Sequence, residues 1–130
     1  MTFLVDTNVL SEGMRPRPDQ EVLDWLNTYE EDIVIDPVIL GEILYGVLRL
    51  PQGRKRREME AWFEVGVRRI VCLPWEAATA VRWANLLSEL RRTGKEMAMK
   101  DSMIAATALV HRLTLVTRMS VIFNMPVCEF

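Results

Sequence analysis

The first twelve residues, MTFLVDTNVLSE (residues 1–12), run from an apolar segment directly into a carboxylate. Residues 2–5 have the short apolar character of a buried β-strand. Asp6 follows at once, and Thr7 and Asn8 after it favour a turn. Asp6 is therefore placed either to cap a helix or to bring a charge to the end of a strand, where α/β folds form their sites.

Strand-like and helix-like segments alternate along the rest of the chain. The RPRP sequence at 15–18 indicates a loop, Asp19 is a helix-capping residue, and Asp36-Pro37 is a typical helix start. This order predicts one domain over residues 1–130, an α/β sandwich with a mainly parallel sheet. We expect strands at 2–5, 32–35, 69–73, 113–117 and 126–130, and helices after Asp19 and at 37–48, 54–65, 74–92 and 102–111.

The composition is that of a globular protein with a real core. Half of the 130 residues are hydrophobic, and the net charge is −2. No apolar run approaches the roughly 18 residues that a membrane span needs, and the N-terminus lacks a basic signal-peptide region, so we expect a cytoplasmic protein without a membrane partner. Cys72 and Cys128 lie in short apolar segments and are expected to be buried free thiols.

Basic residues are concentrated in two short segments. One comprises Arg49 and residues 54–57 (Arg54, Lys55, Arg56, Arg57), and the other comprises Arg91, Arg92 and Lys95. Both could be solvated helix faces and loops. They could equally form a phosphate-contacting rim around an acidic centre.

Two further acids are hard to explain as surface residues. In the helix at 37–48, Val38 and Gly46 lie about 40° to either side of Glu42, which places it in the middle of an apolar stripe. Asp101 shares a stripe with Ile104 and Ala105, at the start of its helix. A salt bridge to an arginine would explain Glu42, and helix capping would explain Asp101.

The three acids become more informative when taken together. Asp6, Glu42 and Asp101 could converge at one end of a parallel sheet, where their charges would repel unless a cation lay between them. Oxygen ligands select hard ions such as Mg²⁺ or Mn²⁺. The residues therefore predict an acidic metal site, of the kind used in phosphodiester hydrolysis.

Four segments of the chain resemble the PIN-domain nucleases, and more closely the VapC/FitB-like toxins of bacterial toxin–antitoxin pairs. They are LVDTNVLSE at 4–12, GEILYG at 41–46, KDSMIAATAL at 100–109 and LVTR at 115–118. The resemblance covers essentially the whole chain, and the motifs keep their order and approximate spacing. It implies a PIN-like three-layer α/β/α sandwich with a central sheet of four to five strands.

The resemblance also implies a function. Similar proteins are endoribonucleases that need Mg²⁺ or Mn²⁺, and related toxins cut tRNA or other structured RNA. By resemblance Asp6, Glu42 and Asp101 hold the metal, while Thr7, Asn8 and Thr117 shape the site. Similar proteins form homodimers, are inhibited by a VapB-like antitoxin, and reach operator DNA through that antitoxin. Arg118 and residues 54–57 are candidates for contacting the RNA backbone.

One segment departs from the family pattern, which usually reads T-R-N-x-x-D-F after the fourth strand. Here Met119 replaces the usual Asn, and Ile122 replaces the usual fourth acid. An apolar side chain cannot bind a cation, so the alternative is a catalytically impaired binding module that acts through the antitoxin and operator complex. A phosphoacceptor domain fits less well, because Thr7 stands where such domains carry a second acid.

Overall fold

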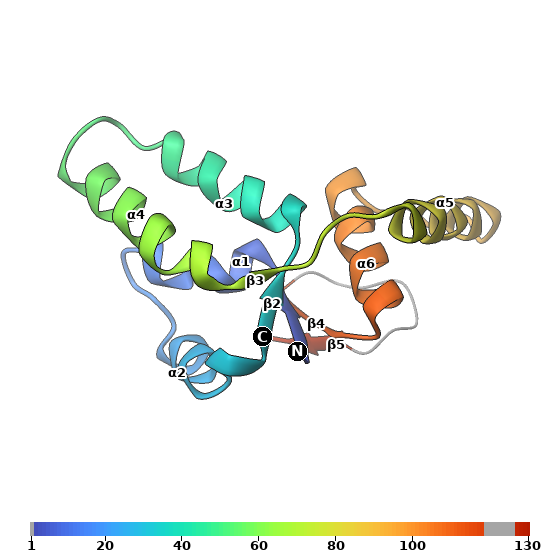
Figure 1. The fold of residues 1–130 in the computed structure, drawn as a ribbon, viewed down its shortest axis with the longest axis horizontal. Coiled ribbons are helices and arrows are strands. Elements are labelled where there is room, and N and C mark those ends of the chain that lie inside the picture. Colours follow the sequence, from blue (N-terminus) through green and yellow to red (C-terminus); the bar gives the residue numbers. More distant parts are fainter. Residues whose placement is uncertain (1, 119–126) are drawn as a thin grey trace.

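The computed structural model describes residues 2–118 and 127–130, and it has five parallel strands in one sheet. The strands are β1 (Phe3–Val5), β2 (Ile33–Ile35), β3 (Val71–Cys72), β4 (Thr114–Thr117) and β5 (Val127–Glu129). Their order across the sheet is β3-β2-β1-β4-β5 (Figure 1). In the centre, Leu4 of β1 lies between Val34 of β2 and Leu115 of β4. The prediction of an α/β fold with a mainly parallel sheet of four to five strands is confirmed, with five strands present in the described residues.

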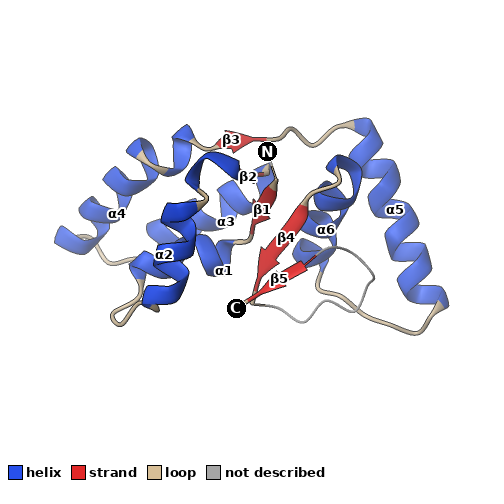
Figure 2. Ribbon diagram, turned by 90° about the horizontal axis from the view of Figure 1, so that it is seen from below, coloured by secondary structure: helices blue, strands red, loops and turns tan. Residues whose placement is uncertain are grey.

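Helices cover both faces of this sheet (Figure 2). Six α-helices occur in the described residues: α1 (Thr7–Leu10), α2 (Gln20–Thr28), α3 (Pro37–Leu48), α4 (Arg54–Val65), α5 (Ala77–Arg92) and α6 (Met99–His111). Leu4 and Leu115 pack with Ile39, Phe63 and Ile104 from α3, α4 and α6.

The opposite face of the sheet has a smaller core. Val5 and Val116 pack with Val22 of α2 and Val9 of α1. Successive residues of β1 and β4 thus supply the two cores in turn, as the alternation of side chains along a strand requires. The layers are those of the expected α/β/α sandwich.

Local signals explain where most elements begin. The Asp36 carboxylate accepts a hydrogen bond from the backbone N–H of Ile39 at 2.9 Å and caps α3, with Pro37 as the first helical residue. Asp19 caps α2 in the same way. The helix at 54–65 and the strand ending at Thr117 also agree with the sequence prediction.

Some boundaries differ from the prediction. Thr7 and Asn8 lie in α1, which is followed by a 3₁₀ turn at Ser11–Met14, so the expected turn is a helix. The long helix begins at Ala77 rather than at Pro74, because the chain stays extended up to Glu76. The helix α6 begins three residues earlier than expected, at Met99.

The cysteine prediction was wrong in part. Cys72 is exposed, and Cys128 is half-buried, both as free thiols. The reason is that β3 is a two-residue strand at the edge of the sheet, and neither of its side chains is buried. Within residues 2–118 and 127–130, no helix has both the length and the apolar character needed to cross a membrane.

Candidate metal and nuclease site

Asp6 lies at the carboxyl end of the central strand β1 and is 3% exposed. One carboxylate oxygen, Oδ1, accepts a hydrogen bond from the backbone N–H of Thr7 at 2.7 Å, so Asp6 caps α1. The other, Oδ2, accepts from the hydroxyl of Thr117 at 3.0 Å. The two uses considered for Asp6 therefore coexist: it caps a short helix, and it stands where an α/β sheet forms its site.

Thr7 connects Asp6 to the second predicted acid. Its hydroxyl donates to Oε1 of Glu42 at 3.1 Å, across a contact between α1 and α3. The Glu42 side chain is 24% exposed, since the buried stripe of α3 is made by Ile39, Ile43 and Val47. Placing Glu42 in the middle of that stripe was wrong: it lies at the edge, where its carboxylate reaches both Thr7 and solvent.

The basic partner of Glu42 is a lysine rather than the arginine considered from the sequence. Lys100, in the first turn of α6, places its ammonium nitrogen 3.0 Å from Oε2 of Glu42. The hydrogen bond and charge of Glu42 raise the pKa of Lys100 above its usual value. Lys100 therefore stays charged beside the acids.

Asp101, the third acid, follows Lys100 and is half-buried in the first turn of α6. The capping residue of this helix is Ala98, so capping does not account for Asp101. Burial raises the pKa of Asp101, repulsion from Glu42 raises it further, and Lys100 opposes both. Ile104, Ala105 and Ala108 of the predicted stripe are buried as expected.

The three acids influence one another electrostatically. Burial raises the pKa of Asp6, the hydrogen bonds from Thr117 and Thr7 oppose that effect, and repulsion from Glu42 and Asp101 adds to it. The structure thus gathers Asp6, Glu42 and Asp101 at one end of β1. An added cation would relieve this repulsion.

The donor atoms of this cluster suit a hard divalent ion. They are carboxylate oxygens, which Mg²⁺ and Mn²⁺ prefer. In the part of the chain that the structure describes, however, no three acidic, histidine or cysteine side chains are close enough together to hold an ion directly. The chemistry fits a metal ion, and binding would require the carboxylates to draw together and Lys100 to move.

Asn8 and Thr117 connect the site to the end of β4. Asn8 accepts a hydrogen bond from the backbone N–H of Arg118 at 3.4 Å, and Thr117 is fully buried against Asp6. Together with Thr7, they join α1, α3 and β4 around Asp6. The role of these three residues in supporting the site stays a prediction.

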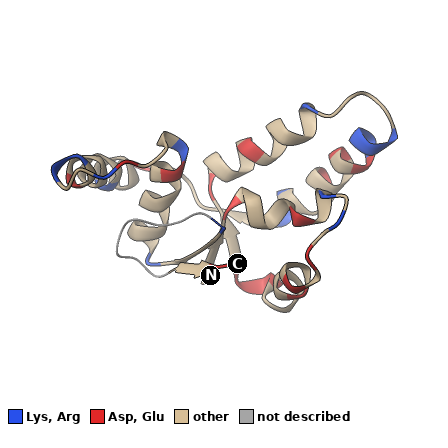
Figure 3. Ribbon diagram, turned by 180° about the vertical axis from the view of Figure 1, so that it is seen from behind, with Lys and Arg blue, Asp and Glu red and all other residues tan. Residues whose placement is uncertain are grey.

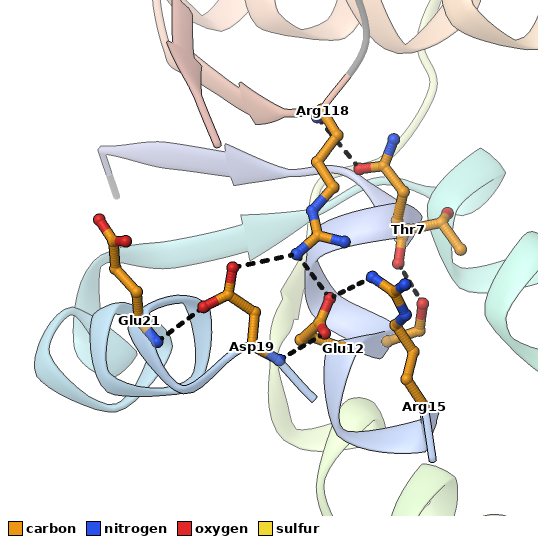
Figure 4. Close-up of polar contacts among 8 residues, drawn as sticks. Thr7, Glu12, Arg15, Asp19, Glu21 and Arg118 are labelled. Atoms are coloured by element: carbon orange, nitrogen blue, oxygen red, sulfur yellow. Dashed lines mark hydrogen bonds and ion pairs between the residues drawn. The ribbon is translucent and has the colours of Figure 1, made fainter. Parts of the chain in front are cut away.

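A buried carboxylate that the sequence analysis did not single out, Glu12, lies beside this site (Figure 4). It accepts from the backbone N–H of Asp19 at 2.8 Å and pairs with Arg118 at 2.7 Å and Arg15 at 3.3 Å. The Asp19 hydrogen bond, followed by the arginines, lowers the pKa of Glu12. The sequence could have indicated that Glu12 is buried, because it follows the buried Val9 by three residues and so lies on the same helical face.

The Glu12 contact changes the interpretation of Arg118. The Arg118 side chain is 24% exposed, and its guanidinium is held by Glu12, with Asp19 at 4.0 Å. Arg118 is thus engaged in a mostly buried ion pair. The pair joins the end of β4 to the turn after α1, and this makes Arg118 a weaker candidate for contacting RNA.

The basic residues at 54–57 begin α4, at the end of the α3–α4 hairpin that projects from the sheet (Figure 3). Arg54 pairs with Glu58 at 3.0 Å, and Arg56 pairs with Glu60 at 3.4 Å. Lys55 and Arg57 are exposed, and neither has an ion pair with a described residue. Along α3, Glu42 lies about 9 Å of helix before Leu48, and the cluster begins beyond the loop that follows.

Comparison with known proteins assigns this arrangement to a family. The PIN domain profile matches residues 3–118, which include all three acids. The chain belongs to the PIN-domain family. The match ends at Arg118, so it includes Thr117 and its contact with Asp6.

Several relatives of this PIN domain are named toxins or ribonucleases. Toxin FitB of Neisseria gonorrhoeae is 35% identical over 120 residues, covering 89% of this chain and 86% of the relative. VapC ribonuclease Y4jK of Sinorhizobium fredii is 29% identical with the same coverage. The resemblance to VapC/FitB-like proteins expected from the motifs is confirmed.

A solved structure, FitAB bound to an IR36 DNA fragment, supports the same assignment. It superposes with a TM-score of 0.91 at 32% identity, covering 98% of this chain and 94% of the other. Met119 and Ile122, where the sequence departs from the family pattern, lie outside the described residues. The roles assigned to individual site residues remain predictions.

Proposed function

We propose that this PIN domain is the toxin of a toxin–antitoxin pair and hydrolyses RNA phosphodiester bonds with Mg²⁺ or Mn²⁺. The observation that carries the proposal is Asp6, buried at the carboxyl end of β1, where burial raises its pKa and the nearby charges of Glu42 and Asp101 raise it further. Relatives named toxin and ribonuclease support the same activity. Transfer RNA is the first substrate to test.

The chain's own residues have distinct parts in this proposal. Asp6, Glu42 and Asp101 would hold the ion, and Thr7 and Thr117 fix the carboxylates of Glu42 and Asp6 by hydrogen bonds. Asn8 joins α1 to β4 behind them. A bound ion would supply an activated water and offset the charge that develops on the phosphate.

Substrate positioning falls to the exposed basic residues in this proposal. Lys55 and Arg57 are free to contact RNA phosphates, while Arg54 and Arg56 have acidic partners on their own helix. The Arg54–Glu58 pair is exposed and weak, so a phosphate can displace its acid, whereas the Arg56 side chain is only 18% exposed and is less accessible to RNA. The α3–α4 hairpin would thus hold the RNA backbone beside the acids.

The proposed partners follow from the relatives. The similar FitAB structure is bound to a DNA fragment, and this favours a VapB-like antitoxin that links this chain to operator DNA. We also propose a homodimer in the cytoplasm. Size-exclusion chromatography with light scattering, on the chain alone and with its candidate antitoxin, tests both assemblies.

The activity is tested by cleavage of labelled RNA with Mg²⁺ or Mn²⁺. We expect cleavage by the wild-type chain, and its loss with EDTA or in Asp6→Ala. The matched control is Glu31→Ala, which removes an exposed acid from the turn before β2. Cleavage that persists in EDTA or in Asp6→Ala contradicts the proposal.

A second function is favoured by one observation, the apolar Ile122 where the family usually has an acid. A site with fewer negative charges binds a cation less tightly. The chain would then act as an impaired nuclease, and mainly as a binding module for the antitoxin and its operator. A large gain of cleavage in Ile122→Asp supports this function, and unchanged cleavage supports a nuclease with three acids.

A further inference from the structure

Lys100 is a cation that the chain itself places on the proposed metal site. Its ammonium nitrogen lies 3.0 Å from Oε2 of Glu42, and it precedes Asp101 in the first turn of α6. The other oxygen of Glu42, Oε1, accepts from Thr7 at 3.1 Å. Both carboxylate oxygens of Glu42 are therefore engaged within the chain.

The helix does not account for the position of Lys100. The amino-terminal turn of a helix carries partial positive charge, which disfavours a lysine there. Nor does burial hold it, because the side chain is 64% exposed. The remaining stabilising interaction of Lys100 is its attraction to the acids. Glu42 is in direct contact with it, and Asp101 is adjacent in the sequence.

We propose that Lys100 is a built-in counter-cation that competes with the divalent ion for Glu42. The inference rests on the proposed metal site. An ion that binds Oε2 of Glu42 must displace the ammonium, because two cations on one carboxylate oxygen repel. Being largely exposed, the lysine can swing into solvent without disturbing the core.

This competition has a functional consequence. Without a divalent ion, Lys100 offsets part of the repulsion among the acids and stabilises the folded chain. With the ion present, the same lysine opposes binding. Lys100 therefore sets the concentration of divalent ion at which the site fills, and so the threshold for the proposed nuclease.

The test measures Mn²⁺ binding rather than cleavage. Electron paramagnetic resonance of free Mn²⁺ gives the dissociation constant for the wild type, Lys100→Met and Asp6→Ala at one pH and ionic strength. The matched control is Arg17→Met, which removes one exposed positive charge from the loop before α2. We expect Lys100→Met to bind Mn²⁺ about threefold to tenfold more tightly and Arg17→Met to match the wild type.

Thermal unfolding of the same variants gives a second measurement. In EDTA, Lys100→Met should unfold at a lower temperature than the wild type, because its acids have lost their counter-cation. Saturating Mn²⁺ should remove or reverse that difference, since a bound ion replaces the ammonium.

The outcomes separate this inference from the function on which it rests. If the wild type and Asp6→Ala bind Mn²⁺ equally, the proposed metal site is wrong. If binding depends on Asp6 but Lys100→Met binds as the wild type does, or more weakly, the site stands and the competition is refuted. Tighter binding by Arg17→Met as well would reduce the effect to net charge and also refute it.

Discussion

Replacing Thr117 with valine tests whether the hydrogen bond to Asp6 holds the centre of the site together. The substitution keeps the side-chain shape and removes the donor that lies 3.0 Å from Oδ2 of Asp6. A hydrogen bond to a charged group contributes about 1.5–3 kcal/mol, and the added methyl group returns up to about 0.8 kcal/mol. The net loss in the free energy of unfolding should be about 1–2 kcal/mol at neutral pH.

Urea denaturation measures this loss, and the midpoint should fall by about 1 M. Thr114→Val is the matched control, because it makes the same change on the same strand. Thr114 is only half-buried, and among the described residues its hydroxyl has no hydrogen bond. We expect that control to leave the midpoint close to the wild-type value.

The loss should also depend on pH. The Thr117 hydrogen bond lowers the pKa of Asp6 against the effect of burial, so the variant has a still higher pKa in the folded state. The penalty is therefore small where Asp6 is protonated, and it grows as pH rises through the pKa of Asp6. Equal losses in Thr117→Val and Thr114→Val, or a penalty that does not change with pH, would refute the reasoning.

Three further results are expected. Asp6→Asn should abolish cleavage. It should leave the urea midpoint unchanged or higher, because the raised pKa of Asp6 means that its charge destabilises the folded chain at neutral pH. A large loss of stability would contradict this. Glu12→Gln should lower the melting temperature at neutral pH, because Arg118 loses its anionic partner. The difference in melting temperature between the variant and the wild type should shrink as the pH falls through the lowered pKa of Glu12, since protonation removes that partner from the wild type as well. Replacing Lys55 and Arg57 with glutamine should weaken the binding of single-stranded RNA of any sequence. It should also reduce the slope of log affinity against log salt concentration by about 1.4, because two phosphate contacts are lost. An unchanged slope would exclude both residues as phosphate contacts.

The sequence was most informative where the signal is local. Asp36 and Pro37 begin α3 because a side-chain oxygen and a fixed backbone angle act within one helical turn. The α3–α4 break at Pro51 and Gly53, and the alternation of strands with helices, are likewise contained in short stretches. Errors arose at boundaries, such as the start of α5 at Ala77, where the signal is a hydrogen bond from the backbone N–H of Glu76 to the Thr79 hydroxyl rather than the proline at 74.

The candidate site shows the same division. Asp6 could be identified from a few residues of sequence, because a charged side chain directly after a buried strand is unusual. The partners of that charge could not: Thr117 is 111 residues away, and only the placement of β4 beside β1 brings its hydroxyl to the carboxylate. A local sequence pattern cannot predict this contact, because the order of the strands in the sheet decides whether the two residues meet.

Sequence alone thus determined the order of the elements and the family, and it singled out three candidate acids, because each is carried by residue types within short segments. Only the tertiary structure decided what those acids touch. It placed Lys100 on Glu42 where an arginine had been considered, and it tied Arg118 to the buried Glu12. Both pairs depend on which helix and strand ends the parallel sheet brings together, and an ionic contact forms only between groups that the fold has already made neighbours.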